Sequence, residues 1–132
     1  MKNSYQVWLQ RAKSSLALAQ TAISKSICYE DLCFQAQQSA EKALKALLIF
    51  YGIEPEKTHN LDNLLKIIER HIDIPKKIRE SINLTPYAAQ TRYPGDYLPL
   101  NKKEYLAAVR IAENCLQWVE KKIKTGSQQL TL

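Results

Sequence analysis

The C-terminal part of the chain carries an apolar stripe at helical spacing, and this pattern restricts the fold more than any other feature. Between residues 101 and 126, apolar side chains recur every three or four positions, as on one face of a helix: Tyr105, Ala108, Val109, Ala112, Leu116, Val119 and Ile123. Asn101 and Glu104 precede the stripe with the spacing of a capping box. The pattern predicts a long helix that Gly126 ends, with residues 127–132 as a frayed tail.

The same period predicts four more helices. Two are long, from Ser4 to Ser26 and from Glu30 to Tyr51, and Gly52 is expected to end the second. Two short ones follow, with Asn60 and Asp73 as their caps. No segment alternates like a strand, and 3 Gly and 5 Pro are too few for a turn-rich β protein. The predicted fold is all-α, an up-and-down helical bundle of four to five helices, three long and two short, in one domain over residues 1–126.

Composition sets the class of protein and its surroundings. The 132 residues are 45% hydrophobic and 24% charged, which is typical of a globular domain. The net charge of +6 suits anionic partners but selects none of them. Three widely spaced cysteines form neither a disulfide framework nor a zinc motif. No segment resembles a signal peptide, and the longest apolar run, residues 46–51, is too short for a membrane span. We therefore expect a cytoplasmic protein with no membrane partner.

Searches for known catalytic motifs find nothing. Three glycines cannot build a phosphate-binding loop of the GxxxxGK[ST] or GxGxxG type, and HExxH is absent. His59 and His71 are the only histidines, and neither lies in a His/Cys cluster. We expect no metal, no cofactor and no catalytic residue that a motif identifies.

The second predicted helix has a polar face with two interpretations. Gln38, Glu41, Lys42 and Lys45 share one side of it, opposite a stripe of alanine and leucine. This is an ordinary amphipathic helix if Glu41 and Lys45 form a solvated pair at helical spacing. Alternatively, the two lysines form one wall of an anion site.

Two further segments carry polar groups suited to nucleotides. The segment from Lys57 to Leu61 contains His59 at the start of the third helix, where free N–H groups favour phosphate, although these residues can also serve as simple caps. In the loop over residues 91–97, Arg92 and Tyr93 suit phosphate recognition with base stacking. The same loop can instead be pinned to the bundle through an Arg92 ion pair with Asp96 or Glu41.

The order of these motifs resembles the HEPN domain family. The resemblance covers residues 4–124 and rests on four segments, namely residues 8–9 (Trp-Leu), 36–48 (AQQSAEKALKALL), 58–61 (THNL) and 92–94 (RYP). It implies a helical bundle similar to the C-terminal domain of kanamycin nucleotidyltransferase, usually homodimeric. It also implies a nucleotide- or RNA-binding partner of a minimal nucleotidyltransferase in a two-component, toxin–antitoxin-like system. The candidate binding residues are then Lys42, Lys45, His59, Arg92 and Tyr93.

One departure from the family pattern bears on activity. Ribonuclease members carry an arginine followed by four to six residues and a histidine, and no arginine here precedes a histidine at that spacing. The chain is therefore expected to bind rather than to cleave. Two alternatives stay open: a ribonuclease toxin with a diverged site that combines Arg92 and His59 across a dimer, and a non-catalytic dimeric scaffold. Three apolar residues outside the main stripes, Val7, Leu18 and Ile111, are candidates for the dimer contact.

Overall fold

The computed structural model describes residues 4–21, 24–90 and 99–130, and their fold is all-α, as predicted. They form six α-helices and one 3₁₀ helix and contain no strand. In chain order the elements are α1 (Tyr5–Ala19), α2 (Tyr29–Phe50), α3 (Leu61–Ile68), α4 (Lys76–Arg79), the 3₁₀ helix η1 (Glu80–Leu84), α5 (Tyr87–Gln90) and α6 (Lys102–Leu130). The three long helices expected from the apolar period are α1, α2 and α6.

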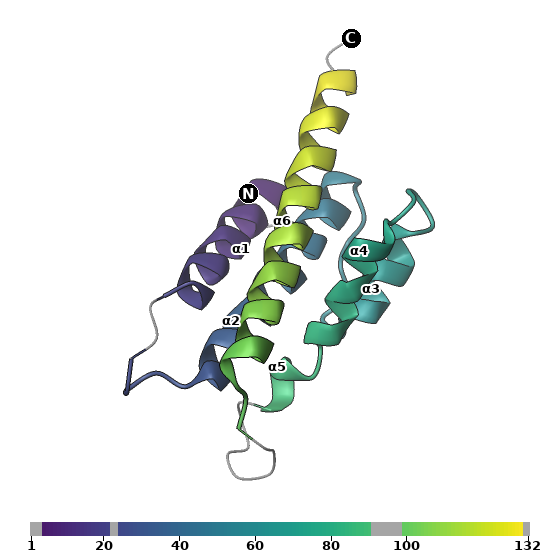
Figure 1. Ribbon diagram of the computed structural model, residues 1–132. Helices are drawn as coiled ribbons and strands as arrows, with labels where there is room; N and C mark the ends of the chain where they lie inside the picture. The colour runs from purple at the N-terminus through teal and green to yellow at the C-terminus, as the bar shows by residue number, and fades with distance from the viewer. Residues whose placement is uncertain (1–3, 22–23, 91–98, 131–132) are drawn as a thin grey trace.

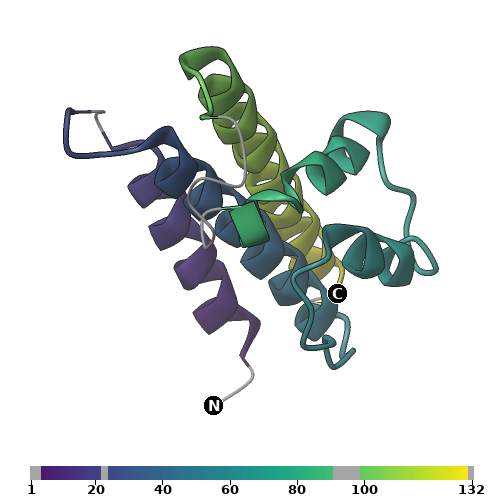
Figure 2. The same ribbon diagram turned by 90° about the horizontal axis from the view of Figure 1, so that it is seen from below.

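Helix α2 lies at the centre of the bundle. Figures 1 and 2 both show α1 on one side of it and the short helices α3 and α4 on the other, with α6 along its length. Helix α1 runs antiparallel to α2 and α6 (Figure 1). This arrangement leaves α2 in contact with α1, α3, α5, α6 and η1, so most of its surface is covered by neighbours.

The core follows the apolar stripes. Alanines of α2 allow close helix packing in its first half, and leucines fill the wider space in its second half. The largest fully buried apolar side chains of the cluster are Leu44, Leu47, Leu48, Leu61, Leu64, Ile68, Leu84 and Val119. Ile111, expected on a dimer surface, is partly buried and packs against this core instead.

Four predicted helix ends are confirmed, three by their hydrogen bonds and one by its backbone conformation. The Ser4 hydroxyl accepts from the Gln6 N–H, and the Asn60 side chain accepts from the Asp62 N–H, at 2.9 Å. Asn101 and Glu104 form the capping box, with each side chain accepting from the other residue's N–H at 2.8 and 3.1 Å. Gly52 has a φ of 78°, the left-handed conformation that follows a helix at low cost only in glycine.

Two helices are shorter than the sequence predicts. Helix α1 ends at Ala19 rather than Ser26, because residues 24–27 form a turn in which the Ser24 hydroxyl and carbonyl accept from the N–H groups of Ser26 and Ile27. The fourth predicted helix starts after Pro75 rather than at Asp73, and it tightens into η1 after one turn. Ile82, spaced for the core, is consequently exposed.

Gly126 does not end the last helix. Helix α6 continues to Leu130, and Gly126 keeps a negative φ within it. A Cβ at this position would lie 2.7 Å from Cε2 of the Phe50 ring, which itself packs edge-on against Tyr5. Glycine is therefore present because α6 approaches the end of α2 closely, and the backbone does not turn there. The final turns of α6 extend past the rest of the bundle (Figure 1).

Two remaining observations concern thiols and membranes. Cys33 and Cys115 are buried, and burial raises the pKa of each thiol to about 12, whereas Cys28 is exposed at the N-cap of α2. Among the described residues, no helix combines the length and the apolarity that a bilayer crossing requires.

Candidate functional site

Five polar residues of α2 form a continuous strip between α1 and the connector from α2 to α3. We call Gln37, Gln38, Glu41, Lys42 and Lys45 the α2 polar strip. The Glu41 and Lys45 side chains are only 4% and 9% exposed, so the prediction of a solvated ion pair on an outer helix face is wrong. The reason is that Trp8 of α1 and His59 of the connector cover the strip from its two sides.

The Glu41 carboxylate is the centre of the strip. Its Oε2 accepts from Lys45 Nζ at 3.0 Å, and its Oε1 accepts from Gln37 Nε2 at 3.0 Å. The same Oε1 lies 2.9 Å from Nδ1 of His59. A buried carboxylate is stable when it is paired and hydrogen-bonded in this way. Glu41 therefore joins two predicted binding residues, Lys45 and His59, through a single side chain.

Lys45 is held on two sides. One is the 3.0 Å contact with Glu41, and the other is the Trp8 ring, whose centroid lies 5.5 Å from Nζ. This distance is within the range of a cation–π interaction. The positive charge of Lys45 is thus already balanced inside the protein, and a bound anion would have to compete with Glu41 for it.

Lys42 is the more accessible of the two lysines. Its Nζ donates to the Ser15 hydroxyl of α1 at 3.2 Å. Partial burial lowers the pKa of Lys42, and the positive charge of nearby Arg11 acts in the same direction. An ammonium group has three donors, so Lys42 keeps hydrogen-bonding capacity for a second partner.

His59 does not cap α3, although the Asn60 next to it does. Its imidazole reaches Glu41, and its backbone carbonyl accepts from Gln37 Nε2 at 3.2 Å. Gln37 is in turn oriented by Gln38, whose Nε2 donates to Gln37 Oε1 at 2.7 Å. The imidazole is nevertheless 57% exposed. The strip therefore fixes both the main chain and the ring of a solvent-facing histidine.

Arg92 and Tyr93, the other two predicted binding residues, lie outside the described residues. The structure brings Lys45 and His59 together through Glu41 and places Lys42 beside Glu41 in the sequence of α2. Sequence reasoning did not include Glu41 or Gln37 among the site residues. Their spacing of four positions, continued by Lys45, was the available signal, but an exposed helix face has the same spacing.

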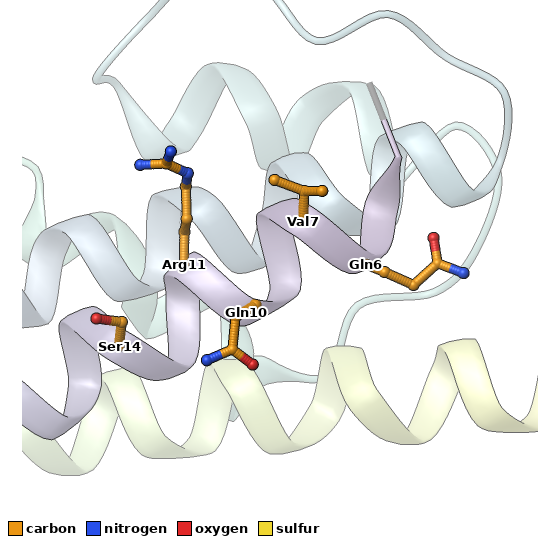
Figure 3. Close-up of a pocket in the computed structure, with 5 residues that line it drawn as sticks. All are labelled: Gln6, Val7, Gln10, Arg11 and Ser14. Carbon is orange, nitrogen blue, oxygen red and sulfur yellow. The ribbon is translucent and has the colours of Figure 1, made fainter. Parts of the chain in front are cut away.

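A separate depression runs along the outer side of α1. Its lining residues are Gln6, Val7, Gln10, Arg11 and Ser14 (Figure 3). All five come from one helix, so they form a shallow surface and not the walls of a cleft. Val7, Gln10, Arg11 and Ser14 lie at helical spacings of three and four positions, so they share one face of α1. We therefore place the candidate site at the α2 polar strip.

The chemistry available at the strip is hydrogen bonding and charge pairing. It offers an ammonium group at Lys42 and a solvent-facing imidazole at His59, both supported by buried partners. Within the ranges 4–21, 24–90 and 99–130, no three His, Cys, Asp or Glu side chains gather closely enough to hold a metal ion.

The bundle and its sequence pattern match a known protein family. The model of the HEPN domain matches residues 5–122, so the chain belongs to the HEPN domain family. Its structure is similar to that of TT1696 from Thermus thermophilus, with 31% identity over 91% of this chain and 98% of that one, and a TM-score of 0.81. ST0689, an archaeal HEPN homologue, is also 31% identical over the same shares, with a TM-score of 0.73. No curated protein matches the chain.

Proposed function

We propose that this HEPN-domain protein is a nucleotide- or RNA-binding partner of a minimal nucleotidyltransferase in a two-component, toxin–antitoxin-like system. The observation that carries the proposal is the α2 polar strip. Lys42 is partly exposed and His59 is largely exposed, and each is held in place by a protein partner, Ser15 of α1 and Glu41 respectively. Groups held in this way lose less entropy when a ligand binds. The net charge of +6 favours an anionic ligand.

The test is a calorimetric titration of the purified protein with ATP. Saturable binding that is weakened by Lys42→Ala and by Arg92→Ala supports a nucleotide site, whereas no heat at millimolar ATP argues against it. Lys121→Ala is the matched control, because it removes an exposed lysine of α6. Each variant is compared at equal folding stability, so that a lost affinity is not a lost fold. The neighbouring genes test the partner: a minimal nucleotidyltransferase that is encoded there and is retained in a pull-down supports the proposal, and an isolated gene counts against it.

The proposal includes a homodimer. Val7 and Leu18 expose 45% and 51% of their surface, and their separation of eleven positions places both on the same side of α1. Light scattering at micromolar concentration tests the assembly. A monomer would remove the dimer from the proposal and with it any site composed of two subunits.

A second candidate function is a ribonuclease toxin with a diverged site. The contact between Glu41 and His59 favours it, since a carboxylate behind an imidazole is a common support for proton transfer. This candidate predicts that expression alone slows growth and that His59→Ala relieves the effect. Harmless expression at high level would count against it. A third candidate, a pure scaffold, predicts that Arg92→Ala lowers the melting temperature and changes no binding event.

A further inference from the structure

The contact with Glu41 decides which ring nitrogen of His59 a ligand can meet. Glu41 Oε1 is 2.9 Å from His59 Nδ1, and the carboxylate is 4% exposed while the imidazole is 57% exposed. The edge of the ring that carries Nδ1 is thus turned to the buried carboxylate. Nε2 is the ring nitrogen that does not face the carboxylate.

The same bonds decide where the proton of the neutral ring lies. Lys45 Nζ and Gln37 Nε2 both donate to the Glu41 carboxylate, one to each oxygen. Since the partner at Oε2 is an ammonium group 3.0 Å away, Glu41 is treated as a carboxylate, which only accepts. The contact with His59 therefore requires a proton on Nδ1, and in a neutral imidazole this leaves Nε2 with a lone pair.

We propose that Glu41 is a positioning residue that holds His59 as the Nδ1–H tautomer, so that Nε2 accepts a hydrogen bond from a ribose hydroxyl of the bound nucleotide. This inference rests on the proposed function and specifies the group of the ligand that meets His59. An acceptor atom suits a hydroxyl, which donates, and does not suit an ionised phosphate oxygen, which only accepts. The phosphate is then bound by Lys42, which has hydrogen-bond donors and a positive charge.

The tautomer is measured directly by nitrogen-15 NMR of the two imidazole rings at pH 8. We expect the Nδ1–H form for His59, and a shift toward the Nε2–H form in Glu41→Leu/Lys45→Leu, where no acceptor faces Nδ1. His71, whose ring stacks on Tyr51, is the internal reference in both spectra and should not change. A wild-type His59 in the Nε2–H form would overturn the inference, whatever the protein binds. So would an unchanged tautomer in folded Glu41→Leu/Lys45→Leu.

The ligand group is tested by calorimetry at pH 8 with ATP, 2′-deoxy-ATP and 3′-deoxy-ATP. We expect one deoxy nucleotide to bind wild-type protein about 2- to 12-fold more weakly than ATP, the usual effect of one neutral hydrogen bond. In His59→Phe the three nucleotides should bind equally. Equal binding of all three to the wild type would overturn the ribose contact and leave the proposed function standing. Absence of any binding would overturn the proposed function and, with it, the ribose contact.

Discussion

The two buried faces of α2 differ in chemistry although both are covered by neighbouring elements. The apolar face carries alanines and leucines that pack in the core, and the α2 polar strip carries Glu41 and Lys45 with their hydrogen-bonding partners. Burial of apolar area stabilises the fold directly. Burial of an ion pair removes both charges from water, and the attraction between them does little more than offset that cost. The apolar face therefore accounts for stability, and the polar strip is present for another reason, which we infer is ligand binding.

The largest expected effect comes from breaking the buried pair on one side only. Glu41→Ala should lower the free energy of unfolding by about 3–5 kcal/mol, because Lys45 keeps its charge in a buried place without a partner. The double variant Glu41→Leu/Lys45→Leu should cost far less, since it removes both charges. Chemical denaturation of the three proteins measures the difference. A single variant as stable as the wild type would show that water reaches the α2 polar strip, so that it is not a buried face of α2.

On the apolar face, by contrast, no second substitution should restore the stability that a truncated side chain loses. Leu47 is fully buried, and Leu47→Ala should cost about 2–5 kcal/mol through lost transfer energy and the cavity left behind. Leu47→Met keeps the volume and should cost less than about 1.5 kcal/mol. The same denaturation experiment checks both. A loss below about 1 kcal/mol for the alanine variant would mean that the core relaxes around the site.

The apolar core should also make stability sensitive to alkaline pH. Burial raises the pKa of Cys115 from 9.0 to about 12, so the folded state keeps a neutral thiol while the unfolded state ionises first. This contribution is complete below pH 9 and is lost as pH rises toward 12. At pH 10 the wild type should have lost about 1 kcal/mol from this group.

Denaturation at pH 8 and pH 10 tests this effect with Cys115→Ala as the comparison. The stability difference between wild type and variant should shrink by about that amount at the higher pH. A constant difference would contradict the assignment of a raised pKa to Cys115. Tyr51, Tyr87 and Tyr105, whose pKa values burial also raises, act in the same direction in both proteins.

The smallest expected effect concerns a single neutral hydrogen bond between α2 and α1. The Ser39 hydroxyl is buried and donates to the Ala12 carbonyl at 2.8 Å. Ser39→Ala should cost about 0.5–1.5 kcal/mol, well below Glu41→Ala, because no charge is left behind. Ser14→Ala, at an exposed position of α1, is the control and should leave the melting temperature nearly unchanged. Equal effects of the two would show that the bond contributes nothing.

Most of the fold could be predicted from the sequence because local signals agree with the packing. The stripe of α6, the caps at Ser4 and Asn60 and the left-handed Gly52 each follow from a short segment. Gly126 could not be predicted, because the reason for a glycine inside α6 is the Phe50 ring, which is distant in sequence. A glycine after an apolar stripe indicates a helix end unless a neighbour demands close approach.

The site was harder to predict because it too depends on contacts between segments that are distant in the sequence. Glu41 and Lys45 at helical spacing give the same pattern on an exposed face and in a buried strip. What distinguishes the two cases is the cover that Trp8 and His59 provide, and both come from other segments. The sequence does identify Lys42, Lys45 and His59 as polar groups suited to an anion. The structure adds Glu41, which the prediction treated as part of a solvated pair.

The central position of α2 also affects how often this helix opens and how fast a ligand can bind to it. A helix covered by α1, α3, α5, α6 and η1 cannot open alone, so its amides should exchange with solvent only when the whole domain unfolds. The α2 polar strip then keeps its arrangement between binding events, and association requires no refolding of α2. We expect a ligand that docks on this strip to meet a rigid frame, with rates set by diffusion and charge.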